Sequence, residues 1–257
     1  MGKIIAVANQ KGGVGKTTTC VNLAASLGAT KRRILLIDMD PQGNASMGSG
    51  VDKNNLTHSM TDILLDAVPL TDTLVQSQAG YDLLPSNSDL TAAEIKLLQT
   101  PNYPKRLHSL LQPLIHEYDF IIIDCPPALN VLTLNSMVAA DSLLIPMQCE
   151  YYALEGLSGL LNTMRQIRDN LNPRLQIEGI LRTMHDGRNR LSVEVTEQLL
   201  THFGDKVFRT VIPRNVRLAE APSHGLPALF YDKRSHGAVA YLALAGEVLR
   251  REKKDNG

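Results

Sequence analysis

The feature that most constrains this chain is a repeated alternation between short apolar runs and longer amphipathic stretches. The apolar runs are rich in Ile, Leu and Val and lack polar alternation, which is typical of parallel strands buried on both faces. Strands are predicted at Ile4–Ala8, Ile34–Ile37, Phe120–Ile123, Ser142–Pro146 and Ile177–Leu181. Helices are predicted at Thr17–Leu27, Asp89–Leu98, Lys105–His116, Ala153–Asn170, Leu191–Phe203 and Ala238–Arg251.

This alternation predicts an α/β fold of three layers, in which helices cover both faces of a doubly wound, mostly parallel sheet. Ligands of such sheets bind beyond the carboxyl ends of the strands, so the residues that follow each strand are the candidates. We expect a single domain over residues 1–257, with a disordered tail from about residue 252 to 257. The stretch Gly43–Asn55, rich in Gly, Ser and Asn, is predicted to be a mobile loop.

Composition narrows the classes of partner and compartment. The 26 basic residues balance 26 acidic ones, so any contact with nucleic acid must come from local clusters of charge. Three widely spaced cysteines without a CxxC pair indicate reduced thiols, and no apolar run approaches the roughly 20 residues of a membrane span. We therefore expect a cytoplasmic protein without stable membrane association.

A glycine-rich loop joins the first predicted strand to the first predicted helix. Its glycines let successive N–H groups point at phosphate oxygens, and the helix adds the positive end of its dipole. Lys16 can neutralise the β- and γ-phosphates, while the Thr17 hydroxyl can ligate Mg²⁺. Because strand, loop and helix occur in the required order, we predict nucleotide binding rather than a turn without a ligand. The cradle consists of Lys11, Gly12, Gly13, Val14, Gly15, Lys16, Thr17 and Thr18.

The loop departs from the common GxxxxGK[ST] pattern, because Gln10 stands where the first Gly would be and Lys11 follows it. Lys11 could be a solvated lysine beside an anion site. Two lysines that bracket one loop indicate instead that Lys11 points away from its own cradle. In a face-to-face dimer it would reach the phosphates of the partner's nucleotide.

Carboxylates follow two of the predicted strands. Asp38 and Asp40 share one side of an extended segment, so that one can hold the water shell of a metal and the other can orient an attacking water. Asp124 closes the apolar run of another strand, the position of an acid that holds Mg²⁺ through water. For Asp38 and Asp40, the alternative is a pair of loop carboxylates that cap a helix.

Five segments together resemble the ParA/Soj family of chromosome- and plasmid-partitioning ATPases, nearly from end to end. They are KGGVGKTT, LLIDMDPQGNAS, FIIIDCPPAL, LLIPMQCEYYALEGL and VIPRNVRLAEAPSHG. The resemblance implies a P-loop fold with a deviant Walker A motif and Mg²⁺-dependent ATP hydrolysis. It assigns Asp40 to the hydrolytic water, Asp38 and Asp124 with Thr17 to the metal, and Lys11 and Lys16 to charge neutralisation.

The same resemblance implies the remaining contacts and partners. Pro213 and Asn215 correspond to the family's adenine contacts, although an ordinary strand-exit turn would have the same residues. Arg188 and Arg217 match positions where the Soj branch carries DNA-contacting arginines, and Arg190 is a candidate helper. The family pattern implies an ATP-bound homodimer that binds double-stranded DNA non-specifically on the nucleoid. A ParB-like centromere-binding protein would stimulate hydrolysis.

Three other functions remain open on sequence. A MinD-like membrane-surface ATPase shares the loop, but the segment Ala238–Arg251 has the spacing of a helix packed on a sheet. A relative of the nitrogenase iron protein would need cysteines placed for a shared cluster, whereas Cys20, Cys125 and Cys149 lie in separate segments. A nucleotide-binding scaffold without turnover conflicts with the presence of Asp40, Asp124 and Lys16, and an ATPase assay would exclude it.

Overall fold

The computed structural model describes residues 2–255, and within them the chain forms an eight-stranded sheet with the order β3-β4-β2-β5-β1-β6-β7-β8. All neighbouring strands pair in parallel except β3 and β4, so the sheet is mostly parallel. The strands are β1 (Lys3–Val7), β2 (Ile34–Asp38), β3 (Val75–Gln76), β4 (Asp82–Leu84), β5 (Phe120–Asp124), β6 (Ser142–Gln148), β7 (Gln176–His185) and β8 (Val207–Pro213).

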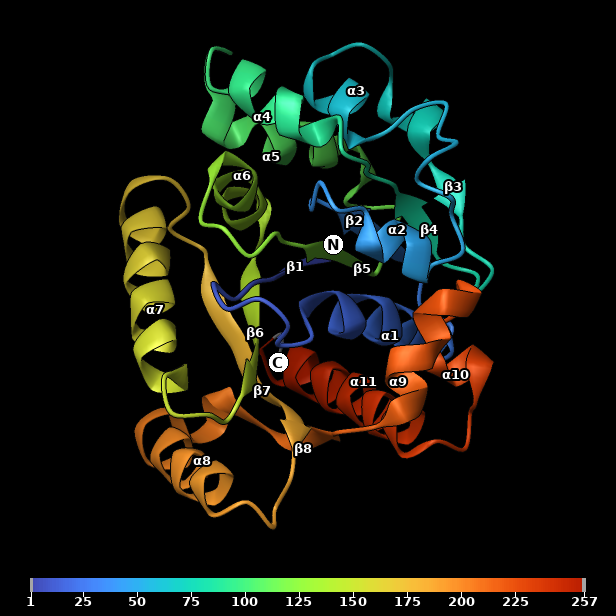
Figure 1. Ribbon diagram of the computed structural model, residues 1–257. Helices are drawn as coiled ribbons and strands as arrows, with labels where there is room; N and C mark the ends of the chain where they lie inside the picture. Colours follow the sequence, from blue (N-terminus) through green and yellow to red (C-terminus); the bar gives the residue numbers. More distant parts are fainter. Residues whose placement is uncertain (1, 256–257) are drawn as a thin grey trace.

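Helices cover both faces of this sheet (Figure 1). Helices α1 and α11 pack together on one face, while α5, α6, α7 and α8 lie on the other. The helices are α1 (Lys16–Gly28), α2 (Asn44–Gly48), α3 (Met60–Leu64), α4 (Leu90–Leu97), α5 (Arg106–Leu111), α6 (Val131–Ala139), α7 (Ala153–Asn170), α8 (Arg190–Phe203), α9 (Val216–Glu220), α10 (Ala228–Tyr231) and α11 (His236–Asp255). The predicted three-layer, doubly wound α/β fold is therefore confirmed.

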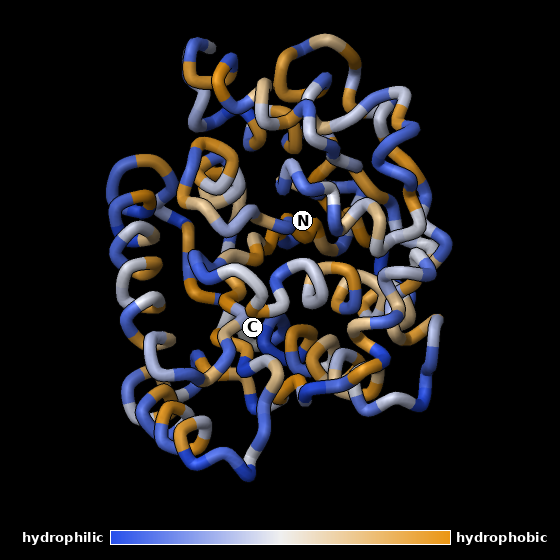
Figure 2. Tube along the Cα trace, viewed as in Figure 1, coloured by the Kyte–Doolittle hydropathy of each residue, from blue (hydrophilic) through white to orange (hydrophobic). Residues whose placement is uncertain are grey.

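The central strands are buried on both sides, as their continuous apolar sequence indicates. In β1, Ile4 and Ala6 belong to the core under α5–α8, whereas Ile5 and Val7 belong to the core under α1 and α11. The tube in Figure 2 is orange along much of the sheet, while α7 and α8 alternate between orange and blue. Helices α7 and α8 thus bury one apolar side and expose the opposite polar side to water, whereas α1 and α6 are buried on most sides.

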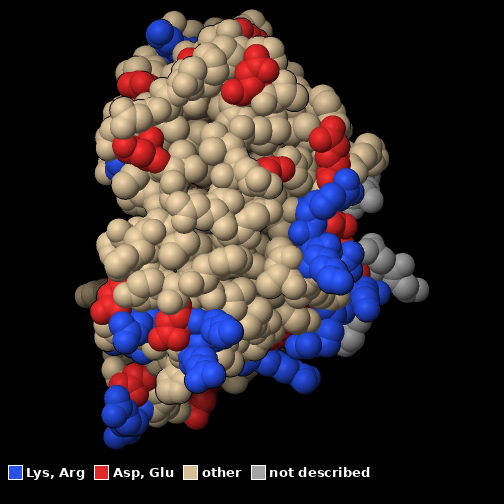
Figure 3. Space-filling view, turned by 90° about the vertical axis from the view of Figure 1, so that its right-hand side faces the viewer, with Lys and Arg blue, Asp and Glu red and all other residues tan. Residues whose placement is uncertain are grey.

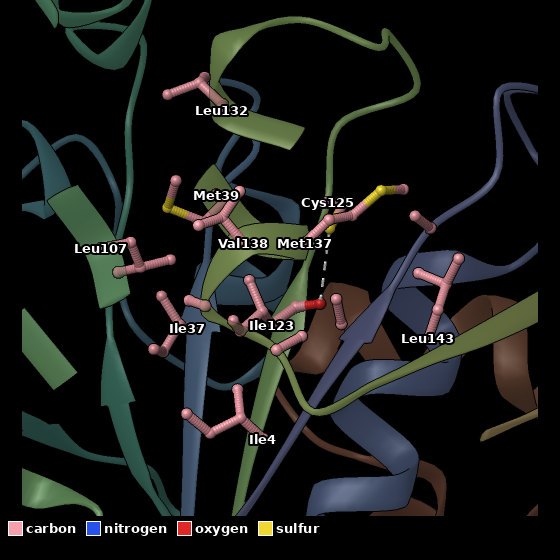
Figure 4. Packing of buried hydrophobic residues seen from close by; sticks show 14 of the residues in the cluster. Ile4, Ile37, Met39, Leu107, Ile123, Cys125, Leu132, Met137, Val138 and Leu143 are labelled. Carbon is pink, nitrogen blue, oxygen red and sulfur yellow. Dashed lines mark hydrogen bonds between the residues drawn. The ribbon is translucent and has the colours of Figure 1, made fainter. Parts of the chain in front are cut away.

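The core between α6 and the sheet encloses one of the cysteines. Figure 4 shows Cys125 near Met137 and Ile123, and its thiol donates to the Ile123 carbonyl oxygen at 3.9 Å. Burial raises the pKa of Cys125 to about 12, so the thiol stays protonated and packs as a small apolar side chain. Cys125 is therefore a packing residue of this core.

Several predicted boundaries are corrected. The helix expected over Lys105–His116 ends at Leu111, because a 3₁₀ turn containing Pro113 follows it. Part of the loop expected at Gly43–Asn55 is helix α2, in which Ala45 and Ser46 are fully buried.

The C-terminal helix is also longer than predicted. Helix α11 continues to Asp255 through most of the predicted tail, and residues 256–257 lie outside the described residues. Near its end, Arg251 donates hydrogen bonds to the carbonyl oxygens of Glu178 and Val207 at 3.1 Å each, which anchors the helix to β7 and β8. No helix within residues 2–255 is both long and apolar enough to cross a membrane.

Candidate nucleotide site and arginine surface

The glycine-rich loop lies at the carboxyl end of β1, between β5 and β6. Gly13 and Gly15 have φ angles of 72° and 89°, a region in which a side chain would be strained, so these two positions require glycine. The Thr183 hydroxyl of β7 donates to the Val14 carbonyl oxygen at 2.8 Å and holds the loop against the sheet. The remaining small residues of the predicted cradle are Gly12, Thr17 and Thr18.

The two lysines of the loop have different environments. Lys16 is buried, with 7% of its surface exposed, and its Nζ donates to the Lys11 carbonyl oxygen at 3.4 Å. Lys11 is exposed, and its Nζ forms an ion pair with the Glu150 carboxylate. The backbone N–H of Lys11 donates to Asn9 Oδ1 at 3.0 Å. The structure thus separates an inner lysine at the cradle from an outer lysine at its rim.

The sheet brings two of the predicted carboxylates together. Asp38 and Asp124 end neighbouring strands in direct register, and both side chains are fully buried. Burial, which disfavours the charged form, raises the pKa of both carboxyls. Charge repulsion from Asp38 raises the pKa of Asp124 further, and repulsion from Asp40 adds to that of Asp38. Two buried acids that repel each other are a place where a cation would be stabilised.

Asp38 already has hydrogen-bond partners. One of its oxygens accepts from the backbone N–H and the hydroxyl of Ser46, at 2.8 and 2.7 Å, and the other accepts from the Asp40 N–H at 3.2 Å. These bonds tie α2 and the loop after β2 to the end of the strand. The side chain predicted to support a metal shell is therefore also what positions this loop.

Asp124, by contrast, keeps one oxygen without a partner. Its Oδ1 accepts from the Cys20 thiol at 3.4 Å, while Oδ2 is buried with no hydrogen-bond partner. The nearby Thr17 hydroxyl lowers the pKa of this carboxyl, although burial has the larger, opposite effect. An unpartnered anionic oxygen beside a hydroxyl fits the hard oxygen ligands that Mg²⁺ prefers.

Asp40 lies beyond the strand in the loop that leads to α2. The residue is 8% exposed, and its Oδ1 accepts from the Gln42 N–H at 2.9 Å. The Ser86 hydroxyl donates to the Asp40 carbonyl oxygen at 2.8 Å, and the Ser86 N–H donates to Ser46 Oγ at 3.0 Å. A closed set of hydrogen bonds through Asp38, Ser46 and Ser86 therefore fixes the Asp40 backbone.

The predicted base contacts follow β8. Pro213 is the last residue of that strand, and Asn215 directly precedes α9. The side-chain oxygen of Asn215 is buried and has no hydrogen-bond partner. Such an oxygen accepts hydrogen bonds only, so it suits a ligand with an amino group, such as adenine.

The predicted DNA-binding arginines each pair with acids of the same subunit. Arg188 and Arg190 are 92% and 93% exposed in their side chains, and Arg217 is 49% exposed. The pairs are Arg188 with Asp186 (3.0 Å), Arg190 with Glu194 (2.9 Å), and Arg217 with Glu220 (2.7 Å) and Asp232 (3.4 Å).

These arginines do not form one cluster within a single subunit. Arg188 lies in the loop before α8, and Arg217 lies in α9, two helices that stand apart in Figure 1. Figure 3 views the face that includes α9 and α10, where Lys and Arg side chains gather mainly in the lower half beside a few acids.

Sequence reasoning missed the residues that hold the site in shape. Thr183 and Ser86 reach the loops from β7 and from the end of β4, far away in sequence. Glu150 lies in the CEYYALEGL segment, and only its position after a predicted strand could have singled it out. Ser46 was within a segment predicted to be mobile, so its contact with Asp38 was not foreseen.

Comparison with known proteins places this arrangement among nucleotide-binding proteins. A domain family described as AAA domain matches residues 2–177. The sporulation initiation inhibitor protein Soj of Bacillus subtilis is 53% identical over 249 residues, covering 96% of this chain and 98% of that protein. The chromosome partitioning protein ParA of Myxococcus xanthus is 50% identical over 253 residues, covering 98% of this chain and 89% of that protein.

Solved structures with similar folds include a protein with a bound nucleotide analogue and an ATPase. Cobyrinic acid a,c-diamide synthase from Mycobacterium smegmatis, with bound ATP analogue and magnesium, has a TM-score of 0.87 at 37% identity. The match covers 98% of this chain and 96% of that one. The cell division ATPase MinD of Pyrococcus furiosus has a TM-score of 0.81 at 27% identity, covering 97% and 99% of the two chains.

Proposed function

Because this chain belongs to the ParA/Soj family of partitioning ATPases, we propose that it is a Mg²⁺-dependent ATPase that segregates or positions a chromosome or plasmid. In this proposal the ATP-bound protein is a homodimer that binds double-stranded DNA without reading its sequence. A ParB-like centromere-binding protein stimulates hydrolysis and returns the subunits to the unpaired state. The protein would act in the cytoplasm, on the nucleoid.

The proposal assigns each residue of the site a role. Backbone N–H groups of the loop and the Lys16 ammonium hold the phosphates, and Asn215 with Pro213 holds the adenine. Thr17 and Asp124 would hold Mg²⁺, which when bound neutralises charge on the phosphate oxygens. Asp38 supports this shell from the next strand.

Asp40 orients the attacking water in this scheme. Its carboxylate lies in a loop fixed by buried hydrogen bonds, which is how an enzyme keeps a group in place for reaction. Lys11 lies at the exposed rim, where it can reach a nucleotide bound to a facing subunit. Phosphoryl transfer then depends on positioning and on charge neutralisation from both subunits.

The observation that best supports this function is the unpartnered, buried Asp124 oxygen beside Thr17 at the start of α1. A buried anionic oxygen without a partner is costly, and a bound cation would remove that cost. The same position lies at the mouth of the glycine-rich loop, so cation and phosphates would be bound side by side.

The decisive experiment is to measure ATPase activity with and without duplex DNA and the candidate ParB-like partner. Stimulation by both together is the expected result. An Asp40→Ala variant should bind ATP, dimerise and remain on DNA without turnover. Recruitment of the wild-type protein to liposomes in a flotation assay with ATP would favour a MinD-like function instead.

A further inference from the structure

The side chain of Lys11 is held within its own subunit. Its ammonium forms an ion pair with Glu150, and the two side chains remain 46% and 44% exposed. Glu150 follows β6, whereas Asp38 and Asp124 end β2 and β5 on the other side of β1. The ion pair therefore directs Lys11 away from the acids of its own site.

Both partners of this ion pair have a fixed backbone. The Glu150 N–H donates to the Gln148 carbonyl oxygen at 2.9 Å, and the Ala153 N–H donates to the Glu150 carbonyl oxygen at 3.0 Å. Asn9, which accepts from the Lys11 N–H, donates in turn to the Pro146 carbonyl oxygen of β6 at 2.8 Å. The rim of the loop is thus tied to β6 and to the start of α7.

Gln10 makes a second contact with α7. A Cβ atom built on Gly159 of that helix would lie 3.5 Å from Gln10 Nε2, so the Gln10 amide rests on the helix surface where a side chain is absent. Gln10 stands where the common pattern has Gly, and Lys11 is the additional lysine that follows it. Each of them contacts α7 or the turn that precedes it.

We propose that Glu150 is a positioning residue that retains Lys11 in the unpaired subunit and must release it when two subunits dimerise. This inference rests on the proposed function, in which Lys11 contacts the nucleotide of the partner subunit. While the Lys11 ammonium is paired with the Glu150 carboxylate, it interacts less strongly with a phosphate. Dimerisation would therefore replace the Glu150 carboxylate with the phosphate of the partner's nucleotide. Glu150 therefore opposes pairing until a triphosphate, with its greater negative charge, is present to replace it.

The test is the dimer dissociation constant of full-length protein with Mg²⁺ and a non-hydrolysable ATP analogue, measured by sedimentation velocity. Glu150→Gln should tighten the dimer about three- to tenfold, since exposed ion pairs are weak and each dimer breaks two of them. The difference should disappear near 1 M salt, where an exposed pair is screened, whereas a packing effect would persist. Nucleotide affinity of the dilute, monomeric variant should match that of the wild type.

Glu155→Gln is the matched control, because it removes the same charge from the first turn of α7 and should leave the dimer constant unchanged. If the wild type dimerises but Glu150→Gln pairs equally or less tightly, the inference is overturned while the proposed function stands. If the wild type stays monomeric with the analogue, the proposed function fails, and this inference fails with it. A tightening that persists at high salt would also contradict it.

Discussion

The nucleotide site and the arginine surface differ in how fully the subunit satisfies its own polar groups. In the site, the oxygens Asp124 Oδ2 and Asn215 Oδ1 are buried and have no partner. On the surface, Arg188, Arg190 and Arg217 are exposed, yet each pairs with an acid of its own subunit. A buried polar group without a protein partner is costly and is suited to binding a ligand, whereas an exposed ion pair is nearly neutral in energy.

This contrast predicts that substitutions in the buried site cause the largest losses of ligand affinity. Lys16→Ala should lower ATP affinity about 100-fold or more, because a buried charge-assisted contact to phosphate is removed and water cannot replace it. Isothermal titration with Mg²⁺ and ATP measures the change. Lys96→Ala, an exposed lysine of α4, is the control and should bind ATP normally. Tight ATP binding by Lys16→Ala would show that the buried lysine is not part of the cradle.

Asp124→Asn tests the cost of burial in the site, because its effect on the free energy of unfolding should depend on pH. Burial beside Asp38 raises the pKa of Asp124, so without metal the folded wild type loses stability as pH rises from about 4 through that raised value. The amide carries no charge to bury. At pH 8 without Mg²⁺ we expect the variant to have a free energy of unfolding higher by about 1–3 kcal/mol.

The measurement is urea unfolding at several pH values, with and without Mg²⁺ and ATP. The advantage of the variant should shrink towards pH 4 and vanish below it, where Asp124 becomes protonated in the unfolded as well as the folded state. Ligand should stabilise the wild type and have a much smaller effect on the variant, because the metal loses a carboxylate. Parallel pH profiles for the two proteins would show that Asp124 is not strained by burial.

The fold was predictable because strands buried on both faces appear in the sequence as continuous apolar runs. The helix Ala153–Asn170 was predicted to the residue, and β1, β2 and β5 to within one residue at each end. Strands β3 and β4 were missed, because two and three residues are too few to show a pattern. Strand β8 and helix α6 were also absent from the predicted ranges, although they have seven and nine residues.

The site was predictable only where chemistry follows directly from a motif. The glycine-rich loop and the acids at strand ends could be named from local sequence. The hydrogen bonds from Thr183, Ser46 and Ser86 connect segments whose proximity depends on strand order, which local sequence does not contain. The pairs of Arg188, Arg190 and Arg217 with acids two to four residues away are local in sequence, whereas the second Arg217 partner, Asp232, lies in another segment that local sequence does not connect to it.

On the arginine surface, Arg217→Glu should change DNA affinity more than any change to the Arg188 ion pair. Loss of one phosphate contact per subunit should weaken binding of the ATP-bound dimer about 10-fold or more and reduce the slope of log affinity against log salt by about 2. Fluorescence anisotropy with a labelled duplex at several salt concentrations gives both values. Arg174→Glu, an exposed residue just before the amino end of β7, is the control, since Arg217 follows the carboxyl end of β8. Equal losses in the two variants would mean that only net charge matters.

The smallest predicted effect is a gain, and it tests whether the surface ion pairs restrain the arginines. The Arg188 guanidinium lowers the pKa of Asp186 to about 2, so the pair persists at every pH at which the protein would be assayed. Asp186→Asn removes the charge but keeps an oxygen that can accept from the Arg188 N–H, so the loop should keep its shape. Freed from its partner, Arg188 should bind phosphate more readily and raise DNA affinity about two- to threefold at low salt. In a protein that already carries Arg188→Ala, Asp186→Asn should give no gain in DNA affinity, because no arginine then remains to be released. A gain that survives in the double variant would mean that Asp186 merely repels the DNA, and the exposed pair would carry no restraint at all.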